Sequence, residues 1–159
     1  MNGLTAKLAS TSKVETTQLL IPPDANGQGI AFGGRVLEWM DRAGAIAAMR
    51  HARTQVVTAA IDQLSFVAPI RVGEIVVIRA QVNATFGSSM EVEVTVMAEP
   101  PERGETRPCC EAFLTFVSIG PDGRPSKAPI LLTETEDEER RSREATIRRA
   151  ERLARRRKG

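Results

Sequence analysis

Hydrophobic and polar residues alternate with a period of two along residues 89–98. Met90 and every second residue after it are apolar on one side, whereas Glu91, Glu93 and Thr95 fall on the other. This period is typical of a β-strand that is buried on one face. Similar runs rich in β-branched and apolar residues predict four more strands, over residues 14–21, 56–66, 74–86 and 109–119.

A helical spacing appears between the first and second of these strands. Pro22-Pro23 ends the first strand, residues 22–32 form a loop, and a helix is predicted from Gly33 to about Arg53. Its alanine-rich and glycine-containing face favours very close packing against a sheet. The apolar positions that follow the helical period are Val36, Leu37, Met40, Ala43, Gly44, Ala47 and Ala48.

The order of these elements predicts an α+β fold. Four consecutive strands with short connections form an antiparallel sheet, and one helix covers only one of its faces. We therefore expect a curved antiparallel sheet wrapped around one long central helix, and the edge or face left over favours a homodimer. This single domain spans residues 12–132, between a flexible N-terminus over residues 1–11 and a charged C-terminal helix or tail over residues 133–159.

The C-terminal segment carries the net charge of the chain. The whole chain has a net charge of +2, and residues 134–159 alone contain ten basic and seven acidic side chains. The acidic residues come first and the basic ones last, as the dipole of a helix favours. We predict a peripheral and mostly solvated helix rather than a nucleic-acid-binding arm. Its few apolar anchors are Ile147, Ala150, Leu153 and Ala154.

Composition excludes several classes of function. Aromatic residues make up 4% of the chain, without a single Tyr, which argues against a stacking surface for nucleic acids. The chain has neither an apolar run long enough to cross a bilayer nor an apolar signal core near its start, so we expect a cytoplasmic protein without a membrane partner. The adjacent Cys109 and Cys110 predict free, buried thiols, and the single histidine, His51, has no companion at metal-ligand spacing, so no metal is expected.

The candidate chemistry lies at the start of the predicted helix. Gly33 and Gly34 allow a close approach there, and the first turn of a helix leaves backbone N–H donors free to bind an oxyanion. Asp41 lies within the apolar helix, where a carboxylate is costly unless it is used. We interpret it as a general base or nucleophile; the alternative is a structural ion pair with Arg35, with Arg42 or with a side chain of a partner subunit.

Motifs along residues 14–130 resemble one known family, the acyl-CoA thioesterases of the hotdog fold. The branch is that of bacterial short- and medium-chain acyl-CoA hydrolases and eukaryotic cytosolic acyl-CoA hydrolases. The resemblance is carried by Pro23-Asp24-Ala25-Asn26, Phe32-Gly33-Gly34, Met40-Asp41-Arg42-Ala43-Gly44, Val56-Val57-Thr58, Val72-Gly73-Glu74, Gly87-Ser88-Ser89-Met90-Glu91-Val92 and Pro121-Asp122-Gly123.

The resemblance implies roles for individual residues. Asp41 falls on the catalytic carboxylate of the family, and Asn26 on a loop amide near the thioester carbonyl, across the dimer interface. Thr58 falls on a strand threonine that could orient Asp41 or water, and Gly33 with Gly34 would form the oxyanion hole. The alternatives are a turn-forming role for Asn26, an ordinary β-branched strand residue at Thr58 and close packing alone at the glycines.

The resemblance implies two parts of the chain that bind coenzyme A. The turn Gly87-Ser88-Ser89 offers backbone and hydroxyl donors for a pyrophosphate, although family members often have a basic residue or Thr where Ser88 stands. Arg71 could bind the ribose phosphate, with a solvated surface charge as the alternative.

The implied reaction is hydrolysis of acyl-CoA to a fatty acid and coenzyme A. It needs no cofactor, because coenzyme A is part of the substrate. The implied assembly is a homodimer with shared active sites, further arranged as a trimer of dimers. A hotdog hydratase is disfavoured because His51 lies ten residues beyond Asp41 and does not pair with it. The remaining alternative is a non-catalytic protein that binds or senses acyl-CoA.

Overall fold

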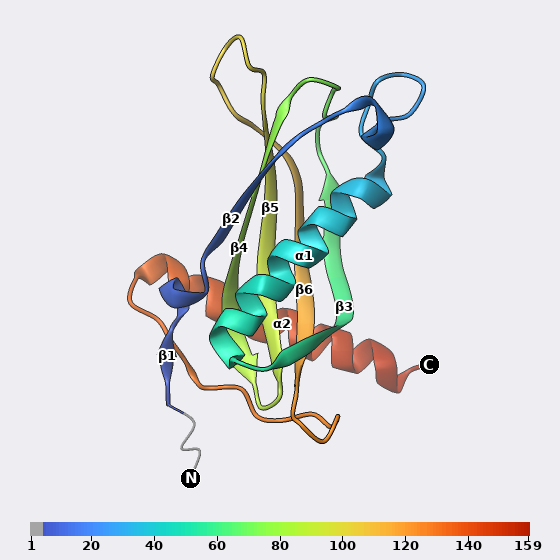
Figure 1. Ribbon diagram of the computed structural model, residues 1–159. Helices are drawn as coiled ribbons and strands as arrows, with labels where there is room; N and C mark the ends of the chain where they lie inside the picture. Colours follow the sequence, from blue (N-terminus) through green and yellow to red (C-terminus); the bar gives the residue numbers. More distant parts are fainter. Residues whose placement is uncertain (1–4) are drawn as a thin grey trace.

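The computed structural model describes residues 5–159. One long helix lies on each face of the main sheet (Figure 1). The predicted helix and strands are all present, with boundaries within a few residues of those expected. In chain order the elements are β1 (Lys7–Leu8), η1 (Ala9–Ser12), β2 (Val14–Leu19), η2 (Pro22–Asp24), α1 (Gly33–Ala52), β3 (Gln55–Phe66), β4 (Ile75–Phe86), β5 (Ser89–Glu99), β6 (Arg107–Ile119), β7 (Leu131–Leu132) and α2 (Glu136–Arg157).

The main sheet has five antiparallel strands in the order β2-β4-β5-β6-β3. Its central strand β5 alternates as the sequence predicts, because Met90, Val92, Val94 and Val96 are fully buried on one face. This face packs on α1, and the curved sheet wraps around the helix (Figure 1). The fold is therefore the predicted hotdog arrangement.

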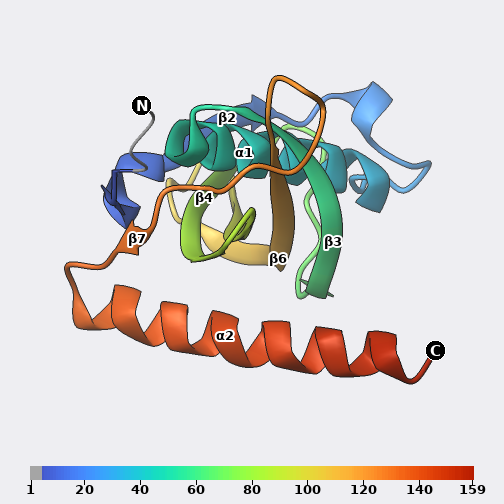
Figure 2. The ribbon, with the colours of Figure 1, turned by 90° about the horizontal axis from the view of Figure 1, so that it is seen from below.

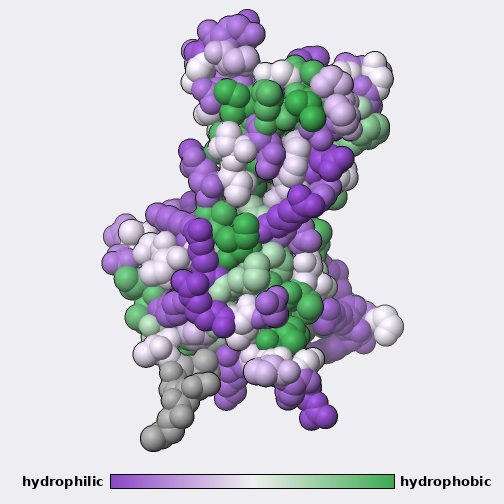
Figure 3. All heavy atoms as spheres, viewed as in Figure 1, coloured by the Kyte–Doolittle hydropathy of each residue, from purple (hydrophilic) through white to green (hydrophobic). Residues whose placement is uncertain are grey.

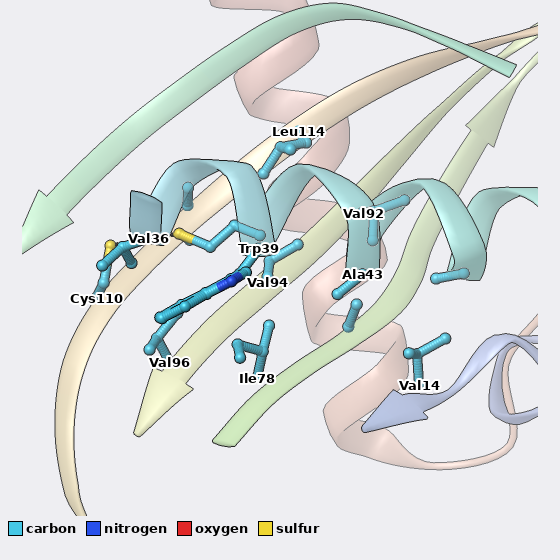
Figure 4. Packing of buried hydrophobic residues seen from close by; sticks show 14 of the residues in the cluster. Val14, Val36, Trp39, Ala43, Ile78, Val92, Val94, Val96, Cys110 and Leu114 are labelled. Atoms are coloured by element: carbon cyan, nitrogen blue, oxygen red, sulfur yellow. Dashed lines mark hydrogen bonds between the residues drawn. The ribbon is translucent and has the colours of Figure 1, made fainter. Parts of the chain in front are cut away.

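Small residues on α1 bring the helix backbone close to the sheet. A Cβ placed on Gly44 would lie 3.0 Å from the Phe116 ring and 3.3 Å from Val94, so only glycine fits without a shift. Around this contact the core is closed by Trp39, which is 8% exposed, and Met40, which is fully buried. Figure 4 shows Trp39 and Ala43 of α1 above the valines of β5.

The C-terminal helix α2 covers the other face of the sheet, opposite α1 (Figure 2). Its buried residues are Ala145 and Arg148, whereas Ile147 is 59% exposed, so the prediction of Ile147 as an anchor is wrong. Arg148 binds both carboxylate oxygens of Glu91 on β5, at 3.0 and 2.7 Å, and lies over the ring of Phe113. The helix is thus held by an ion pair beneath it rather than by an apolar stripe.

Two further ion pairs tie α2 to the sheet on either side of Arg148. Arg141 binds Glu93 at 2.7 Å and Arg152 binds Asp62 at 2.8 Å. Burial outweighs the nearby arginine and holds the pKa of Glu93 above its usual value. The outer face of the sheet therefore carries charged residues but is covered by α2. The alternating sequence pattern alone predicts that this face is exposed to solvent.

The segment before β2 is more ordered than the flexible N-terminus expected over residues 1–11. Lys7–Leu8 pairs in parallel with Leu131–Leu132, and the hydroxyl of Ser12 accepts a hydrogen bond from the Val82 N–H at 3.0 Å. Residues 1–4 lie outside the described part of the chain.

Apolar side chains remain exposed along the edge strand β3 and at the upper end of the molecule. On β3 and just after it, Val57, Phe66 and Val67 are 52%, 53% and 67% exposed. Figure 3 shows apolar atoms gathered near the upper end of the molecule, where β2 ends and α1 begins. The apolar edge strand β3 has no neighbouring strand on its outer side within the described residues, and such an edge can pair with another chain. None of the helices within residues 5–159 meets the length and hydropathy that a membrane span requires.

Candidate active site

The start of α1 presents two unpaired backbone donors. The helix begins at Gly33 after Phe32, whose N–H donates to the Asp24 carbonyl at 3.0 Å. Within residues 5–159, the N–H groups of Gly33 and Gly34 have no acceptor. A Cβ on Gly34 would meet nothing within 4 Å, so the side of the helix start at Gly34 is not crowded by other described residues. This arrangement suits an oxyanion, which the positive end of the helix dipole also favours.

Asn26 holds the loop that leads to this helix start. Its side-chain oxygen accepts hydrogen bonds from the N–H groups of Gln28 and Ile30, at 2.9 and 3.1 Å. The predicted turn-forming role is therefore present. Its amide nitrogen makes no hydrogen bond to any described residue, and this donor remains open to a ligand.

Asp41 lies half-buried on the side of α1 that faces β3 and is held by one hydrogen bond. The Thr58 hydroxyl donates to the Asp41 carboxylate at 2.7 Å. Thr58 sits where the pairing of β3 with β6 shifts register, between Thr58 and Ala60. Such a bulge turns a side chain that a regular strand would aim elsewhere.

The ion pair considered as an alternative for Asp41 is not formed in the described chain. Arg42 binds Glu38 at 2.6 Å, and Arg35 binds Glu38 at 3.0 Å and Asp24 at 3.1 Å. Both arginines near Asp41 are thus engaged elsewhere, and the carboxylate keeps Thr58 as its hydrogen-bond donor.

The two halves of the site lie apart in one chain. Asp41 follows Gly33 by eight residues, which corresponds to about 12 Å along a helix. The free N–H groups also point away from the helix body, because helix N–H bonds are directed towards its N-terminus. Within a single chain, Asp41 and the helix start therefore do not converge on one reactive centre.

Comparisons of sequence and structure find proteins that are similar to this chain. The thioesterase superfamily model matches residues 28–105. An acyl-CoA thioester hydrolase of Bacillus subtilis, YkhA, which is itself described as uncharacterized, is 36% identical over 132 residues, covering 83% of this chain and 77% of that protein. This chain belongs to the acyl-CoA hydrolases of the thioesterase superfamily. Its family fold is the hotdog fold described above.

The mammalian relatives are longer than this chain. Mouse acyl-coenzyme A thioesterase 11 is 39% identical over 148 residues, covering 92% of this chain but only 25% of the mouse protein. The mouse cytosolic acyl coenzyme A thioester hydrolase is 36% identical over 134 residues, covering 83% of this chain and 35% of that protein. The chain thus spans about a quarter to a third of these two relatives.

Solved structures of the family match almost the whole chain. An acyl-CoA hydrolase from Bacillus cereus is 34% identical with a TM-score of 0.92, covering 97% of this chain and 94% of that one. A hexameric acyl-CoA thioesterase without ligand has a TM-score of 0.91 at 36% identity, covering 95% and 97%. The acyl-CoA hydrolase of Staphylococcus aureus, solved with butyryl coenzyme A and coenzyme A, has a TM-score of 0.89 at 34% identity, covering 95% and 92%.

The turn Gly87-Ser88-Ser89 lies at the opposite end of the sheet from the start of α1 (Figure 1). The chain itself uses part of this turn: the carbonyls of Gly87 and Ser88 accept from Ala128 and Ser118 at 2.9 and 2.8 Å. Within one chain this turn is therefore not brought together with Asn26 or Gly33.

Arg71, in contrast, lies beside the Asn26 loop. It pairs with Ile30 in an isolated bridge, and its N–H donates to Glu74 at 2.8 Å. Glu74 in turn binds Arg107, which holds the pKa of Glu74 below its usual value. Arg71, Arg103 and Arg107 line a cleft of about 450 Å³ together with Glu74 and Glu102, which leaves a small excess of positive charge there.

Three other side chains of types that can take part in catalysis are buried. His51 is fully buried, its Nε2 lies 2.7 Å from the Pro129 carbonyl, and burial lowers its pKa. Cys109 and Cys110 are free thiols, as predicted, and burial raises the pKa of Cys110 to about 11. Within the described chain no group of His, Cys, Asp or Glu side chains is placed to hold a metal ion.

One feature of the site was not anticipated from the sequence. An apolar pocket of about 380 Å³ opens beside Gly33, between the start of α1 and the ends of β3 and β6. Its signal in the sequence is weak, because Phe66 and Val67 read as ordinary strand residues and their exposure appears only in the fold.

Proposed function

We propose that this protein hydrolyses acyl-CoA thioesters to a free acid and coenzyme A, with Asp41 as the general base or nucleophile. The observation that carries this proposal is the 2.7 Å hydrogen bond from Thr58 to Asp41. It fixes a carboxylate at a half-buried position while both neighbouring arginines are bound elsewhere. A carboxylate oriented in this way is available to activate water.

The reaction needs a proton acceptor and a place for negative charge. In the general-base route, Asp41 takes a proton from water as the water oxygen attacks the thioester carbon. The negative oxygen of the tetrahedral intermediate is held by the free N–H groups of Gly33 and Gly34 and by the amide of Asn26. When the tetrahedral intermediate collapses, the C–S bond breaks and the proton held by Asp41 passes to the departing thiolate of coenzyme A. In the nucleophilic route the carboxylate attacks the thioester carbon and expels the thiolate of coenzyme A, which gives a mixed anhydride. Water then hydrolyses the anhydride to the free acid and regenerates the Asp41 carboxylate, and the proton released passes to the thiolate.

A set of alanine variants in a relative supports these assignments. Structures of the S. aureus hydrolase were determined with one Asn, one Asp or one Thr replaced by Ala. The replaced positions are separated by 15 and 17 residues, the same separations as between Asn26, Asp41 and Thr58.

We further propose that each active site is shared by two subunits. The distance of about 12 Å between Gly33 and Asp41 leaves each half without its complement in one chain. A second copy that pairs along the apolar edge strand β3 would supply the missing half, with Asn26 and the helix start from one subunit and Asp41 with Thr58 from the other. The hexameric relative supports a trimer of such dimers.

The nucleotide part of coenzyme A has two candidate contacts. Arg71 and the cleft that it lines lie beside the Asn26 loop of the same chain, whereas the turn Gly87-Ser88-Ser89 would approach this loop only from another subunit. The reaction uses no cofactor in this scheme. We infer that the protein acts in the cytoplasm, as the name of its cytosolic mouse relative suggests.

The test is release of coenzyme A thiol from a panel of acyl-CoAs by the purified full chain. Asp41→Asn keeps the size of the side chain and is expected to remove most of the turnover while the oligomer persists in size-exclusion chromatography. An unchanged rate in Asp41→Asn would contradict the assignment of the base. Tight binding of acyl-CoA without turnover of any panel member would instead favour the non-catalytic binding protein.

A further inference from the structure

The Asn26 loop, residues 25–31, is closed at its base by Asp24. The Asp24 carbonyl accepts a hydrogen bond from the Phe32 N–H at 3.0 Å, directly before the helix begins. The loop follows η2 and lies beside the first turn of α1, at the upper end of the molecule in Figure 1. A contact that fixes the base of this loop against the helix therefore also fixes the Asn26 amide relative to the free N–H groups of the helix start.

Arg35 joins the base of the loop to α1. Its Nε lies 3.1 Å from Oδ1 of Asp24, and its Nη1 lies 3.0 Å from Oε2 of Glu38, one turn further along the helix. The other carboxylate oxygen of Asp24 accepts from the Ile21 N–H at 3.2 Å, so both oxygens are engaged. Because the guanidinium is planar and binds two carboxylates at once, its orientation is fixed, and it holds the loop base to the first two turns of the helix.

The two ends of this contact differ in their exposure. The side chain of Asp24 is 12% exposed, whereas that of Arg35 is 39% exposed. Fully exposed ion pairs contribute little to stability, but removal of Arg35 leaves a carboxylate that is largely out of water without its positive partner. The carboxylate regains water only if the base of the loop moves away from the helix. A change at Arg35 is therefore expected to displace the loop.

Backbone hydrogen bonds hold the far side of the loop to the segment before β4. The Ala31 N–H donates to the Ile70 carbonyl at 2.9 Å, for example. These bonds do not involve α1. The placement of the loop base against the helix therefore depends on the chain connection at Phe32 and on the contact with Arg35.

We propose that Arg35 is a positioning residue for thioester hydrolysis, acting through Asp24 on the Asn26 amide. It holds this amide where the amide and the free N–H groups of the helix start donate to the same oxygen. This rests on the proposed thioesterase function. The oxygen becomes negative only as the tetrahedral intermediate forms, so a displaced amide lowers kcat more than it raises KM.

Substitutions at both ends of the ion pair test this role. Arg35→Met and Asp24→Asn each remove the ion pair and are expected to lower kcat about tenfold with KM within about twofold, a part of the 10² to 10³ that loss of one oxyanion donor costs. Arg35→Lys keeps the charge and is expected to retain most of kcat. Arg79→Met provides the matched control, because it removes an arginine from an exposed ion pair with Glu15, at 2.8 Å, away from the site. A wild-type kcat in folded Arg35→Met would overturn the proposal.

A double variant separates positioning from a general loss of stability. In Asn26→Asp no amide donor is left to place, so the addition of Arg35→Met is expected to lower kcat by less than about twofold further. Thiol release from the same acyl-CoA measures both steps. A further tenfold loss in the double variant would show that Arg35 supports the fold rather than the amide, and would refute the proposal.

Hydrogen exchange of the amides of residues 25–31 gives a readout that needs no turnover. Exchange is expected to be faster in Arg35→Met than in the wild type and unchanged in Arg79→Met. Faster exchange without hydrolysis of any acyl-CoA by the wild type would retain Arg35 as the anchor of the loop and reject the thioesterase. Hydrolysis by the wild type with unchanged exchange and kcat in Arg35→Met would retain the thioesterase and reject the role of Arg35.

Discussion

Two inactive variants of this chain are expected to restore activity to each other when they share a dimer. Asp41→Asn removes the proposed base. Asn26→Asp keeps the side-chain oxygen that accepts from Gln28 and Ile30, so the loop is preserved, but it replaces the open amide donor with a negative oxygen. Loss of one oxyanion donor, as in Asn26→Asp, lowers kcat by about 10² to 10³. Asp41→Asn lacks the base, so each variant alone is expected to be nearly inactive.

The magnitude of the restoration follows from the separation of the two half-sites. Gly33 and Asp41 are about 12 Å apart along one helix, and in the proposed shared site Asn26 comes from one subunit and Asp41 from the other. In a mixed dimer, one site then carries both changes and the other carries neither. Equal amounts of the two chains form mixed dimers in half of the assemblies, which returns about a quarter of the wild-type activity.

The assay uses co-expression with two different affinity tags, so that assemblies containing both chains are isolated and thiol release is measured on them directly. If the assembly is an isolated dimer, about half of the wild-type rate per subunit is expected; if it is the proposed trimer of dimers, about a quarter is expected, because about half of its dimers are mixed. Asp41→Asn mixed with Thr58→Val provides a matched control, because Asp41 and Thr58 belong to the same half-site and no intact site is formed. A mixed Asn26–Asp41 dimer that is no more active than its parents would refute the shared site.

Three further outcomes follow from individual contacts. Thr58→Val removes the hydrogen bond to Asp41 and is expected to lower kcat/KM about tenfold or more, whereas Thr58→Ser keeps the hydroxyl and is expected to retain most of the activity. Both rates are measured by thiol release, and urea unfolding checks that the variants are as stable as the wild type. Arg148→Ala leaves the buried Glu91 carboxylate unpaired and is expected to lower the free energy of unfolding by about 3–5 kcal/mol, measured in urea. Burial lowers the pKa of His51 below 6.5, so the folded state disfavours the proton; the stability that depends on neutral His51 is complete above pH 6.5 and is lost as the pH falls towards the lowered pKa. His51→Gln is expected to flatten this part of the stability profile, measured by urea unfolding between about pH 5 and pH 7; a profile identical to that of the wild type would contradict it.

Most of the fold could be predicted because its determinants are local. The alternation along β5 and the helical spacing of α1 each depend on neighbouring residues, and the helix runs over Gly33–Ala52, one residue short of its expected end. It ends at Arg53, whose φ of 56° is left-handed, without the glycine that usually marks such an end. The resemblance to acyl-CoA thioesterases is confirmed by the relatives and by the hotdog fold.

The contacts of α2 could not be predicted because they join residues far apart in sequence. Arg148 and Glu91 are 57 residues apart, and each alone reads as a solvated charge. The helix turns Ala145 and Arg148 towards the sheet, so the phase of its buried face differs from the one that its apolar residues suggest. Charged residues therefore form part of the buried surface here, and a hydropathy pattern assigns them to solvent.

The candidate site explains why sequence reasoning leaves two interpretations open for most of its residues. Asn26 holds its loop with the side-chain oxygen and keeps the nitrogen free, so the structural and the chemical role use different atoms of one side chain. At Gly33 a Cβ would make only ordinary contact with the Phe66 ring, at 3.5 Å, whereas the N–H is left for a ligand. Asp41 differs, because its structural alternative requires the same carboxylate that catalysis needs. The engagement of Arg35 and Arg42 by other carboxylates therefore favours the chemical role at Asp41, and this is the residue at which a substitution separates the two interpretations.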